Sequence, residues 1–407
     1  MSWYGKLPAN WESRTIKSLF TVKKEIAGSE GYDVLSITQH GIKVKNTESN
    51  EVQMAKSYEK YQFVNIGDFA MNHMDLLTGW VDYSKHFGVT SPDYRVFTVH
   101  DNLQSKDYLL KVLQLCYSLR IFYAYGRGAA SEGRWRLPRK EFMNFLIPLP
   151  PRDEQDQIVR YLDWKVSQIN RLVSAKRRQI ELLREQKKVT ISEAVKQTES
   201  CQQCKIKNLA FFKSGTNLTA QEISDEGNYP VYGGNGVRGY YPEYTHDGEY
   251  LLVGRQGALC GNVHYVNMKF WPTEHAVTVK PYNIAYAKWL YYLLTDMNLN
   301  QYSNAAAQPG LSVEHVTNLP AYFPPLDTQQ AIADRLDVQC ANINDIVAKL
   351  LEEITLFTEY RTRLISDIVT GKLDVRGIAV PVYEVIEIAQ KASEVVTESD
   401  GFIGDLR

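Results

Sequence analysis

The chain has 407 residues, of which 44% are hydrophobic and 23% are charged. This composition is typical of a folded globular protein, and the length is sufficient for two domains with connecting structure. The net charge of −1 argues against simple electrostatic coating of nucleic acid, because such proteins usually carry a strongly basic domain. No apolar run approaches the ~18 residues of a membrane span, and residues 1–6 lack the pattern of a signal peptide. We therefore expect a cytoplasmic protein without a membrane partner.

The five cysteines are odd in number and scattered along the chain, which does not fit a disulfide framework. Cys201 and Cys204 have the spacing of half a zinc site. No second Cys pair or His pair lies at a matching distance, and a tetrahedral zinc site needs four ligands. We therefore predict reduced thiols and no metal site.

Two domains alternate with two long helices in the predicted chain order. The domains are residues 1–149 and 200–323, which are rich in Tyr, Gly and short apolar stretches, as mixed β domains with long loops are. Each domain precedes a predicted helix, over residues 150–199 and 324–376. The tail 377–407 has no predicted role.

The two helical segments form the clearest internal repeat. Residues 150–195 align with residues 324–369 at a fixed offset of 174 without gaps, and 16 of the 46 positions are identical. Each copy begins with a proline pair, at Pro150 and at Pro324, that is followed by Asp-x-Gln-x2-Ile. Such an internal repeat indicates two copies of one structural unit.

The domains are repeated more weakly. The segment that begins at Ile16 resembles the one that begins at Ile206, and residues 92–99 resemble residues 272–279. An apolar stretch with helical spacing then follows in each domain, over residues 108–119 and 287–294. The helical segments are more similar to each other than the domains are. This pattern suits a constant helical part that carries two domains of different binding specificity.

Both copies of the repeat are predicted to be helical. Asp153 and Asp327 suit a first helical turn, where a carboxylate accepts hydrogen bonds from the free backbone N–H groups. Apolar residues then recur in steps of four and three, which is typical of a coiled-coil seam. Each run of about 40–45 residues without Gly or Pro gives roughly 60–65 Å of helix at 1.5 Å per residue, and Gly371 ends the second run at a C-cap position. The seam positions are Ile158, Leu162, Val166, Ile169, Val173, Ile180 and Leu183 in the first copy, and Ile332, Leu336, Cys340, Ile343, Val347, Leu350, Ile354, Phe357, Leu364 and Ile368 in the second.

A helix of this length cannot be covered by its own domain, so its simplest partner is the other copy. The predicted fold is therefore of the α+β class. It consists of two mixed α/β domains separated by a long antiparallel two-helix coiled coil, with a pseudo-two-fold internal repeat.

Motifs for chemistry are absent from the sequence. Gly234, Gly236 and Gly239 formally match the dinucleotide-binding pattern, but that pattern must open a helix that receives the phosphates. Tyr240-Tyr241-Pro242 follows instead, so we predict a glycine-bearing loop between strands. No amino-methyltransferase, Walker or nuclease pattern is present. We predict no catalytic residue and no cofactor in this chain.

The proline pairs with their Asp-x-Gln helix starts resemble those of one family, the specificity subunits of Type I restriction-modification systems. In the second domain, residues 229–240, 254–258 and 270–272 resemble the recognition domains of that family, and residues 88–94 resemble a variant in the first domain. The resemblance covers residues 1–376. The loop at Gln308-Pro309-Gly310 departs from the family pattern, and the tail has no counterpart in it.

The resemblance implies two target recognition domains, each of which reads one half of a bipartite double-stranded DNA site. It also implies docking of methyltransferase (modification) subunits, two in number, and association with restriction subunits (translocase and nuclease) through the complex. S-adenosylmethionine would belong to the methyltransferase subunits. The chain itself would be a non-catalytic DNA-binding subunit of a restriction system.

Contacts to DNA call for Arg or Lys at phosphates and guanine edges, and for Asn or Gln at adenine edges. The candidates in the first domain are Lys43, Lys45, Lys85, Tyr94, Arg95, Arg127, Arg134 and Arg136. The candidates in the second domain are Asn235, Arg238, Arg255, Gln256, Lys269, His275 and Asn304. The basic run 176–178 in the first helix is interpreted as a solvated helix face.

Two other functions are compatible with parts of the sequence. A coiled-coil scaffolding protein would use the helices and would bind no specific DNA sequence. A fused restriction enzyme would need nuclease and methyltransferase motifs, which the sequence lacks. Sequence-dependent DNA affinity in complex with a methyltransferase separates the specificity subunit from the scaffold.

Overall fold

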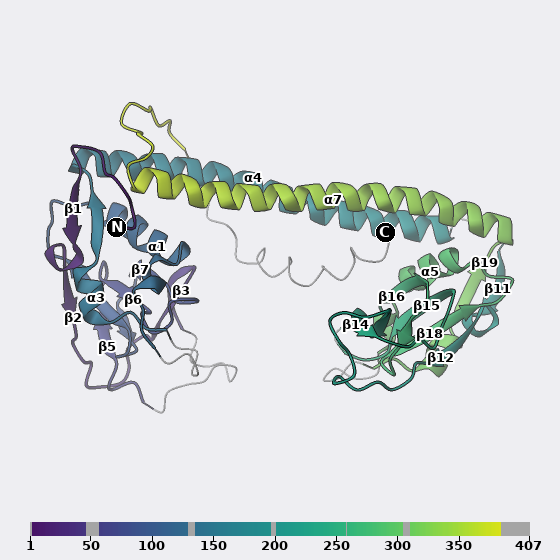
Figure 1. Cartoon of the computed structure of the whole chain (residues 1–407). Helices are drawn as coiled ribbons and strands as arrows, with labels where there is room; N and C mark the ends of the chain where they lie inside the picture. The colour runs from purple at the N-terminus through teal and green to yellow at the C-terminus, as the bar shows by residue number, and fades with distance from the viewer. Residues whose placement is uncertain are drawn as a thin grey trace. The chain divides into compact units, whose positions relative to one another are not determined.

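The computed structural model describes residues 2–45, 57–128, 135–196, 201–257, 259–303 and 310–383. The chain divides into two compact units (Figure 1). Unit 1 combines residues 1–174 with 353–390, and unit 2 combines residues 175–352 with 391–407. Each unit contains one mixed domain and part of each of two long helices, α4 (Arg152–Lys196) and α7 (Leu326–Val369).

The domain of unit 1 is built on an antiparallel sheet in the order β2-β9-β6-β7. Its strands are β2 (Phe20–Lys23), β9 (Arg95–Val99), β6 (Phe69–Met71) and β7 (Val81–Tyr83). Phe20, Phe69 and Phe97 meet at centroid distances of 5.2 to 5.4 Å and form the aromatic centre of the core. Because these rings come from three neighbouring strands, their packing holds those strands together.

The remaining elements of unit 1 surround this sheet. A short antiparallel pair, β1 (Glu12–Thr15) with β10 (Leu146–Leu149), leads into the 3-10 helix η1 (Ile16–Ser18). A hairpin and a second short pair lie beside the sheet: β3 (Leu35–Thr38) with β4 (Gly41–Val44), and β5 (Gln62–Val64) with β8 (Gly88–Thr90). The helices are α1 (Lys106–Ser118), α2 (Ile121–Ala124) and α3 (Arg139–Asn144).

The domain of unit 2 is built on a sheet in the order β12-β18-β15-β16, again antiparallel throughout. Its strands are β12 (Ala210–Ser214), β18 (Ala276–Pro281), β15 (Glu249–Gly254) and β16 (Val263–Asn267). The pair β11 (Gln202–Lys205) with β19 (Pro320–Phe323) leads into η3 (Ile206–Asn208). The other elements are β13 (Tyr229–Gly233), β14 (Gly236–Tyr241), β17 (Trp271–Pro272), α5 (Ala287–Asp296), η4 (Leu299–Tyr302) and α6 (Val313–Thr317).

The second domain repeats the strand order of the first. In both, a terminal strand pair leads into a 3-10 helix, and the last strand of the four-stranded sheet in chain order, β9 or β18, lies beside the first, β2 or β12. The two segments that begin at Ile16 and Ile206 resemble each other in sequence, and both form these 3-10 helices. The two apolar stretches predicted to be helical lie in α1 and α5.

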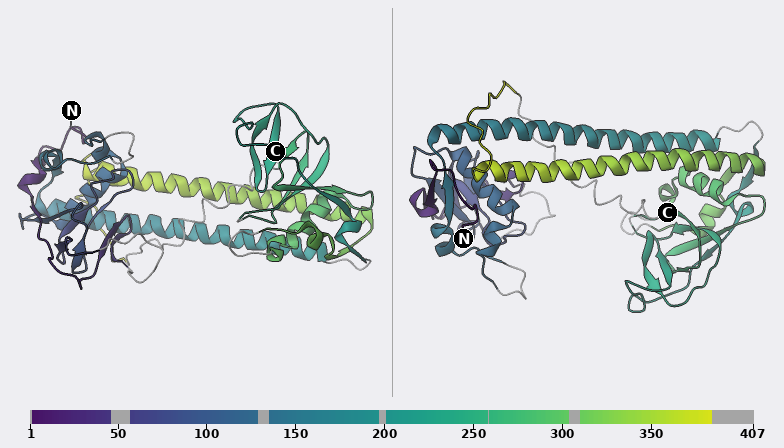
Figure 2. Two further views of the ribbon diagram at one scale, coloured as in Figure 1. Left: turned by 90° about the horizontal axis from the view of Figure 1, so that it is seen from below. Right: turned by 45° about the horizontal axis from the view of Figure 1, so that its top comes forward.

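The two long helices lie beside each other within each unit, as both views in Figure 2 show. In unit 1, Gln157 near the start of α4 donates to Val375 O (3.0 Å), which lies just after the end of α7. Asn170, later in α4, contacts Arg361, which lies earlier in α7. In unit 2, the end of α4 shares a buried cluster with the start of α7. The helices are therefore antiparallel in each unit.

The buried side of α7 follows the predicted stripe. Leu336, Cys340, Ile343, Val347, Leu350 and Ile354 are all buried, in alternating steps of four and three. Along α4, five of the seven predicted positions are buried and Val166 and Leu183 are half-buried. Gly371 follows α7 with a φ of 74°, as the predicted C-cap requires. Among the described residues, no helix is both long and apolar enough to cross a membrane.

A buried glutamine anchors each domain to the start of its long helix. Gln155 accepts a hydrogen bond from Ser105 N (2.8 Å) and donates to Pro150 O (2.8 Å). Gln329 accepts from Tyr286 N (2.8 Å) and donates to Pro324 O (2.9 Å). Both side chains are fully buried. A buried amide with all of these partners fixes the orientation of domain and helix, because leaving any of them unpaired is costly.

An ion pair reinforces each anchor about two turns further along the helix. Asp163 of α4 pairs with Lys111 of α1, and Asp337 of α7 pairs with Lys288 of α5. Asp337 also accepts a hydrogen bond from the Tyr292 hydroxyl (2.7 Å). The two aspartates are equivalent in the 174-residue repeat. The repeat therefore encodes the same joint between domain and helix in each unit.

Candidate nucleic-acid interface

The glycine-rich segment of the second domain forms a tight hairpin between β13 and β14. Gly233 pairs with Gly236, so Gly234 and Asn235 make the turn. Gly236 has a φ of 93°, which favours glycine because it has no Cβ. The side chain of Arg238 lies across Gly233, where an added Cβ would come within 2.4 Å of its Cδ. The predicted glycine-bearing loop between strands is confirmed.

Three loops meet at this turn and bring five predicted residues together. An added Cβ at Gly234 would lie 3.2 Å from His275 O and 3.3 Å from Gln256 O, so the backbones approach closely there. Arg255 N donates to His275 O (2.8 Å). We call Asn235, Arg238, Arg255, Gln256 and His275 the hairpin cluster.

The side chains of the hairpin cluster are available to a ligand. Asn235, Arg238, Arg255 and Gln256 are exposed. The Arg255 guanidinium lies 3.5 Å from Ser214 Oγ, and His275 lies 3.2 Å from the Glu274 carboxylate. Exposed guanidinium and amide groups on this hairpin and on the loop after β15 match the hydrogen-bonding edges of guanine and adenine in a major groove.

One residue that supports the hairpin cluster was missed in the sequence. Asn262 donates to the Asn235 amide oxygen (3.0 Å) and so orients the side chain at the tip of the turn. The dipeptide Gly261-Asn262, with a φ of 89° at Gly261, is the signal that could have identified a turn there.

Lys269 does not join the hairpin cluster. Its ammonium lies 4.7 Å from the centroid of the Tyr244 ring, which contacts the ring of Tyr229. Tyr229 begins β13, whereas Gly233 at the hairpin turn ends it. A hydrogen bond to Tyr244 raises the pKa of Lys269. The other predicted residue of this domain, Asn304, lies outside the described residues.

In the first domain, Arg127 and Arg136 are brought together. Their backbones exchange two hydrogen bonds of 2.8 and 3.0 Å, and both side chains are exposed. Arg127 also contacts the Glu141 carboxylate at 3.1 Å. The segment between them carries Arg134, which lies outside the described residues. Two exposed guanidinium groups on one isolated antiparallel β-bridge suit contacts to phosphates or guanine.

Arg95 was predicted to contact DNA, but its side chain is buried. Only 6% of the residue is exposed. Its guanidinium lies 4.5 Å from the centroid of the Phe142 ring and donates to Leu137 O (3.1 Å). Burial lowers its pKa to about 10. The side chain therefore packs inside the domain, because β9 is covered on both faces, and Arg95 is not placed to contact DNA.

His73 lies beside Arg95 and was not singled out in the sequence. Its Nδ1 is buried without a partner among the described residues, and its backbone carbonyl accepts a hydrogen bond from Leu137 N (3.0 Å). Burial, followed by the charge of Arg95, lowers the pKa of His73 to about 4. The ring is therefore neutral near pH 7.

The other predicted residues of the first domain occupy separate positions. Lys43 lies on β4 opposite Ser36, and Lys45 N donates to Val34 O (2.8 Å) just after that strand. Lys85 is exposed after β7. Tyr94 packs against the cluster around Leu35, Ile37 and Ile42, and burial raises its pKa. These side chains remain predictions as DNA contacts.

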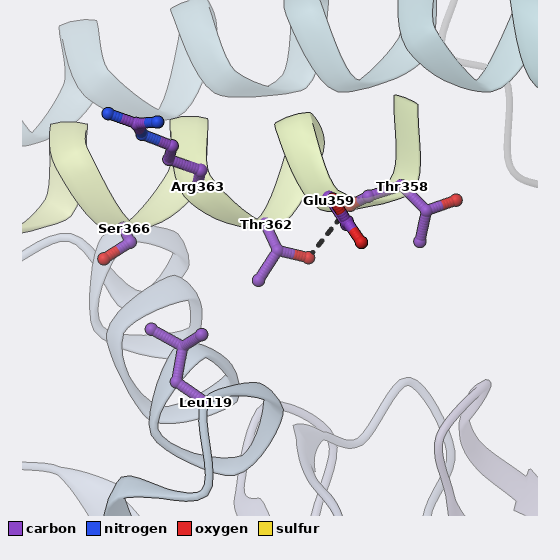
Figure 3. A pocket seen from close by; sticks show the side chains of 6 residues that line it. All are labelled: Leu119, Thr358, Glu359, Thr362, Arg363 and Ser366. Atoms are coloured by element: carbon purple, nitrogen blue, oxygen red, sulfur yellow. Dashed lines mark hydrogen bonds between the residues drawn. The ribbon is translucent and has the colours of Figure 1, made fainter. Parts of the chain in front are cut away.

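An open groove of about 410 Å³ lies in unit 1 between the end of α1 and α7 (Figure 3). Leu119 projects into it from the α1 side, and Thr362 donates to the Thr358 carbonyl (3.1 Å) along α7. None of the predicted DNA-contacting residues lines this groove. The groove therefore belongs to the helical frame rather than to the hairpins.

Within the described ranges, no group of three or more His, Cys, Asp or Glu side chains is placed to hold a metal ion. Burial raises the pKa of the Cys204 thiol. The predicted absence of a metal site stays a prediction.

Together, the paired domains, their common joint to long helices and their exposed hairpins define a tandem two-domain protein of the nucleic-acid recognition class. The model of the Type I restriction modification DNA specificity domain matches residues 8–182 and 199–356. The chain belongs to this family.

Curated relatives agree with this assignment. The chain is 35% identical over 238 residues to the Type I restriction enzyme EcoprrI specificity subunit of Escherichia coli. This match covers 50% of the chain and 55% of that relative, so it spans about half of the relative's length. A putative Type I restriction enzyme MjaX specificity subunit of Methanocaldococcus jannaschii is 22% identical over 91% of the chain and 96% of its own length.

Solved structures show the same fold. One match is a chain from a solved structure that describes the complex assembly and conformational transition of a Type I restriction-modification system. It has a TM-score of 0.67 at 14% identity and covers 90% of this chain and 100% of its own. The HsdS subunit of Thermoanaerobacter tengcongensis matches with a TM-score of 0.50 at 14% identity, over 91% and 100%. At this identity, the likeness supports the fold alone.

Proposed function

We propose that this chain is the non-catalytic DNA-specificity subunit of a Type I restriction-modification complex. Each domain reads one half of a bipartite double-stranded target, and the paired helices form an antiparallel coiled coil that separates the two readers about a pseudo-two-fold axis. Methyltransferase subunits, two in number, dock on this frame and supply S-adenosylmethionine. Restriction subunits join through the complex.

The observation that carries this proposal is the duplicated joint between domain and helix. The same buried glutamine and the same aspartate–lysine pair recur in each unit, and the sheets share one strand order. A bipartite DNA site needs two readers in equivalent settings, because the symmetry of such a site mirrors that of the protein. A simple scaffold has no such need for two exposed, chemically different hairpins.

The polar chemistry of the loops supports DNA as the ligand. The hairpin cluster offers guanidinium and amide groups, and the β-bridge of Arg127 and Arg136 offers two further guanidinium groups. Arg pairs in two-point fashion with guanine, and Asn or Gln pairs similarly with adenine. The loops differ between the domains, which would give each half-site its own sequence.

The net charge of −1 gives this chain few phosphate contacts of its own. Neutralised phosphates supply most of the affinity of DNA-binding proteins and set its salt dependence. We therefore expect weak DNA binding by the isolated chain, with a shallow salt slope, and a gain in affinity when methyltransferase subunits share the DNA.

The test is methylation of a DNA library with randomised sequence by the chain reconstituted with its methyltransferase subunits. A specificity subunit yields a split motif with two defined half-sites and a fixed spacer. Methylation without sequence preference, or a complex that forms without any DNA affinity, would instead favour the scaffolding function. A titration of the isolated chain at several salt concentrations serves as the control for its own contribution.

A further inference from the structure

A polar pair interrupts the apolar contact between α4 and α7 in unit 1. Arg361 of α7 donates from Nη1 to the Asn170 amide oxygen of α4 at 3.1 Å. Only 7% of Asn170 is exposed. Its neighbours in the stripe are the buried Ile169 and Val173, so the amide lies where apolar residues otherwise fill the contact.

Unit 2 contains a second pair of the same kind. Lys187 of α4 donates from Nζ to the Asn344 amide oxygen of α7 at 2.9 Å. Burial lowers the pKa of Lys187. The pair adjoins Ile343 and Val347, which are buried. In this unit the helices exchange roles, because α4 provides the cation and α7 provides the asparagine.

The two pairs are copies of each other. Asn344 lies 174 positions after Asn170, and Arg361 lies 174 positions after Lys187, which is the offset of the internal repeat. The residue numbers of the two pairs also have the same sum, as antiparallel helices in one register require. Each pair is local to its own unit, yet both specify the same alignment of the two helices.

The apolar stripes by themselves discriminate poorly between registers. A slip by one heptad still places apolar residues opposite apolar residues at most positions, because apolar residues recur at most steps of four or three. The same slip would move Asn170 from Arg361 to Ile354 or Ile368, and would move Asn344 from Lys187 to Ile180 or Ala194. All four are buried apolar residues. Asn170 is buried and Asn344 is half-buried, and an amide that is removed from water without a partner is disfavoured.

We propose that the asparagine–cation pairs Asn170–Arg361 and Asn344–Lys187 fix the register of the two long helices against a slip by a heptad. They act as positioning residues, because each acts through the alignment of the helices and not by touching DNA. On the proposed function, this register is what determines the spacer between the two half-sites of the DNA target.

Native Cys340 provides a direct measure of the register in unit 2. Cys340 and Ile191 belong to one buried cluster, and the register that the two pairs share places them opposite each other. A slip by one heptad in the direction that brings Asn170 to Ile354 would place Arg184 opposite Cys340 instead, and this is the slip that the cross-link measures. Oxidative cross-linking of full-length chains that carry either Ile191→Cys or Arg184→Cys, read by peptide mass spectrometry, therefore reports the two registers separately from the other native cysteines.

The test replaces both pairs by leucine, with the substitutions N170L, R361L, N344L and K187L. Apolar replacement of a buried polar pair often preserves stability, so the helices should remain paired. We expect the ratio of the cross-link at position 191 to that at position 184 to fall on the order of tenfold. The matched control, R361K with K187R, keeps a donor at both positions and should keep the ratio.

An unchanged ratio in the folded leucine variant would overturn the proposal, since the apolar packing and the contacts of the helices with their domains would then set the register. If circular dichroism shows that the fourfold variant is unfolded, N344L with K187L alone gives the same comparison in unit 2. The methylation library separates the proposal from the proposed function. If the cross-link ratio changes and the spacer does not, the pairs still position the helices. The register of the helices then does not determine the length of the spacer between the half-sites.

Discussion

The two domains are joined to their helices in the same way but carry different hairpins. At the joints, Gln155 and Gln329 make equivalent buried hydrogen bonds. At the hairpins, β3 and β4 turn between Thr38 and Gly41, with the Thr38 hydroxyl bonded inside the turn, whereas β13 and β14 turn between two glycines. This difference shows that the repeat preserves the joint between each domain and its helix, while the exposed loops of the two domains diverge.

The largest expected effect is on the shared frame. Ile343→Asp would place a charge on the buried side of α7, where only 9% of the residue is exposed, and should cost ~3–5 kcal/mol in the free energy of unfolding. The matched control is Ile346→Asp on the same helix, since Ile346 is 43% exposed. Denaturant unfolding followed by circular dichroism measures both. Equal losses would show that the buried side of α7 is wrongly assigned.

The next largest effect on stability is expected at the two joints, where it compares the buried glutamines of unit 1 and unit 2. Gln329→Ala would leave Tyr286 N–H and the Pro324 carbonyl without the buried amide, at about 1–3 kcal/mol per unpaired group. Gln155→Ala should cost a similar amount in unit 1, whereas the exposed neighbour Gln330 can be changed to Ala with little effect. Thermal unfolding of the three variants tests this. Very different losses at the two glutamines would contradict an equivalent joint.

Substitutions at the exposed loops should each affect a different half-site, whereas substitutions at the two joints should have similar effects. Arg255→Ala should weaken the reading of one half-site by ~1–3 kcal/mol if it removes a two-point base contact, and Arg136→Ala should do so at the other. The exposed Lys207, in η3, offers a control as Lys207→Ala. The measurement is library methylation by the reconstituted complex. If Arg255→Ala relaxed both half-sites equally, the domains would form one joint reading surface.

The smallest expected effect is a pH dependence specific to the first domain. The pKa of His73 falls to about 4 because of burial and then the charge of Arg95, while the unfolded value is ~6.5. The unfolded state therefore binds more protons between these values, so stability is full above pH ~6.5 and is lost as the pH falls towards 4. With partial exposure discounted, the loss is on the order of 1–2 kcal/mol. His73→Gln should flatten this slope in denaturant titrations at several pH values, and an unchanged slope would assign it to other groups.

The sequence by itself determined the parts of this protein that depend on periodicity and local chemistry. The steps of four and three predicted the buried side of α7, because one face of a helix recurs with its turn. Proline pairs and Gly371 predicted the helix limits, and the glycines from Gly234 to Gly239 predicted a turn, since each acts through its own backbone.

Only the tertiary structure decided which distant residues meet. Arg95 was expected at the surface, yet the layers on both sides of β9 bury it against Phe142. Arg255 and His275 share a site with the turn at Asn235 because strand order, not chain order, makes their loops neighbours. Likewise, Asn170 finds Arg361 only when the helices pair. Such contacts join residues far apart in the chain, and the pattern of residues around any one of them carries no record of its partner.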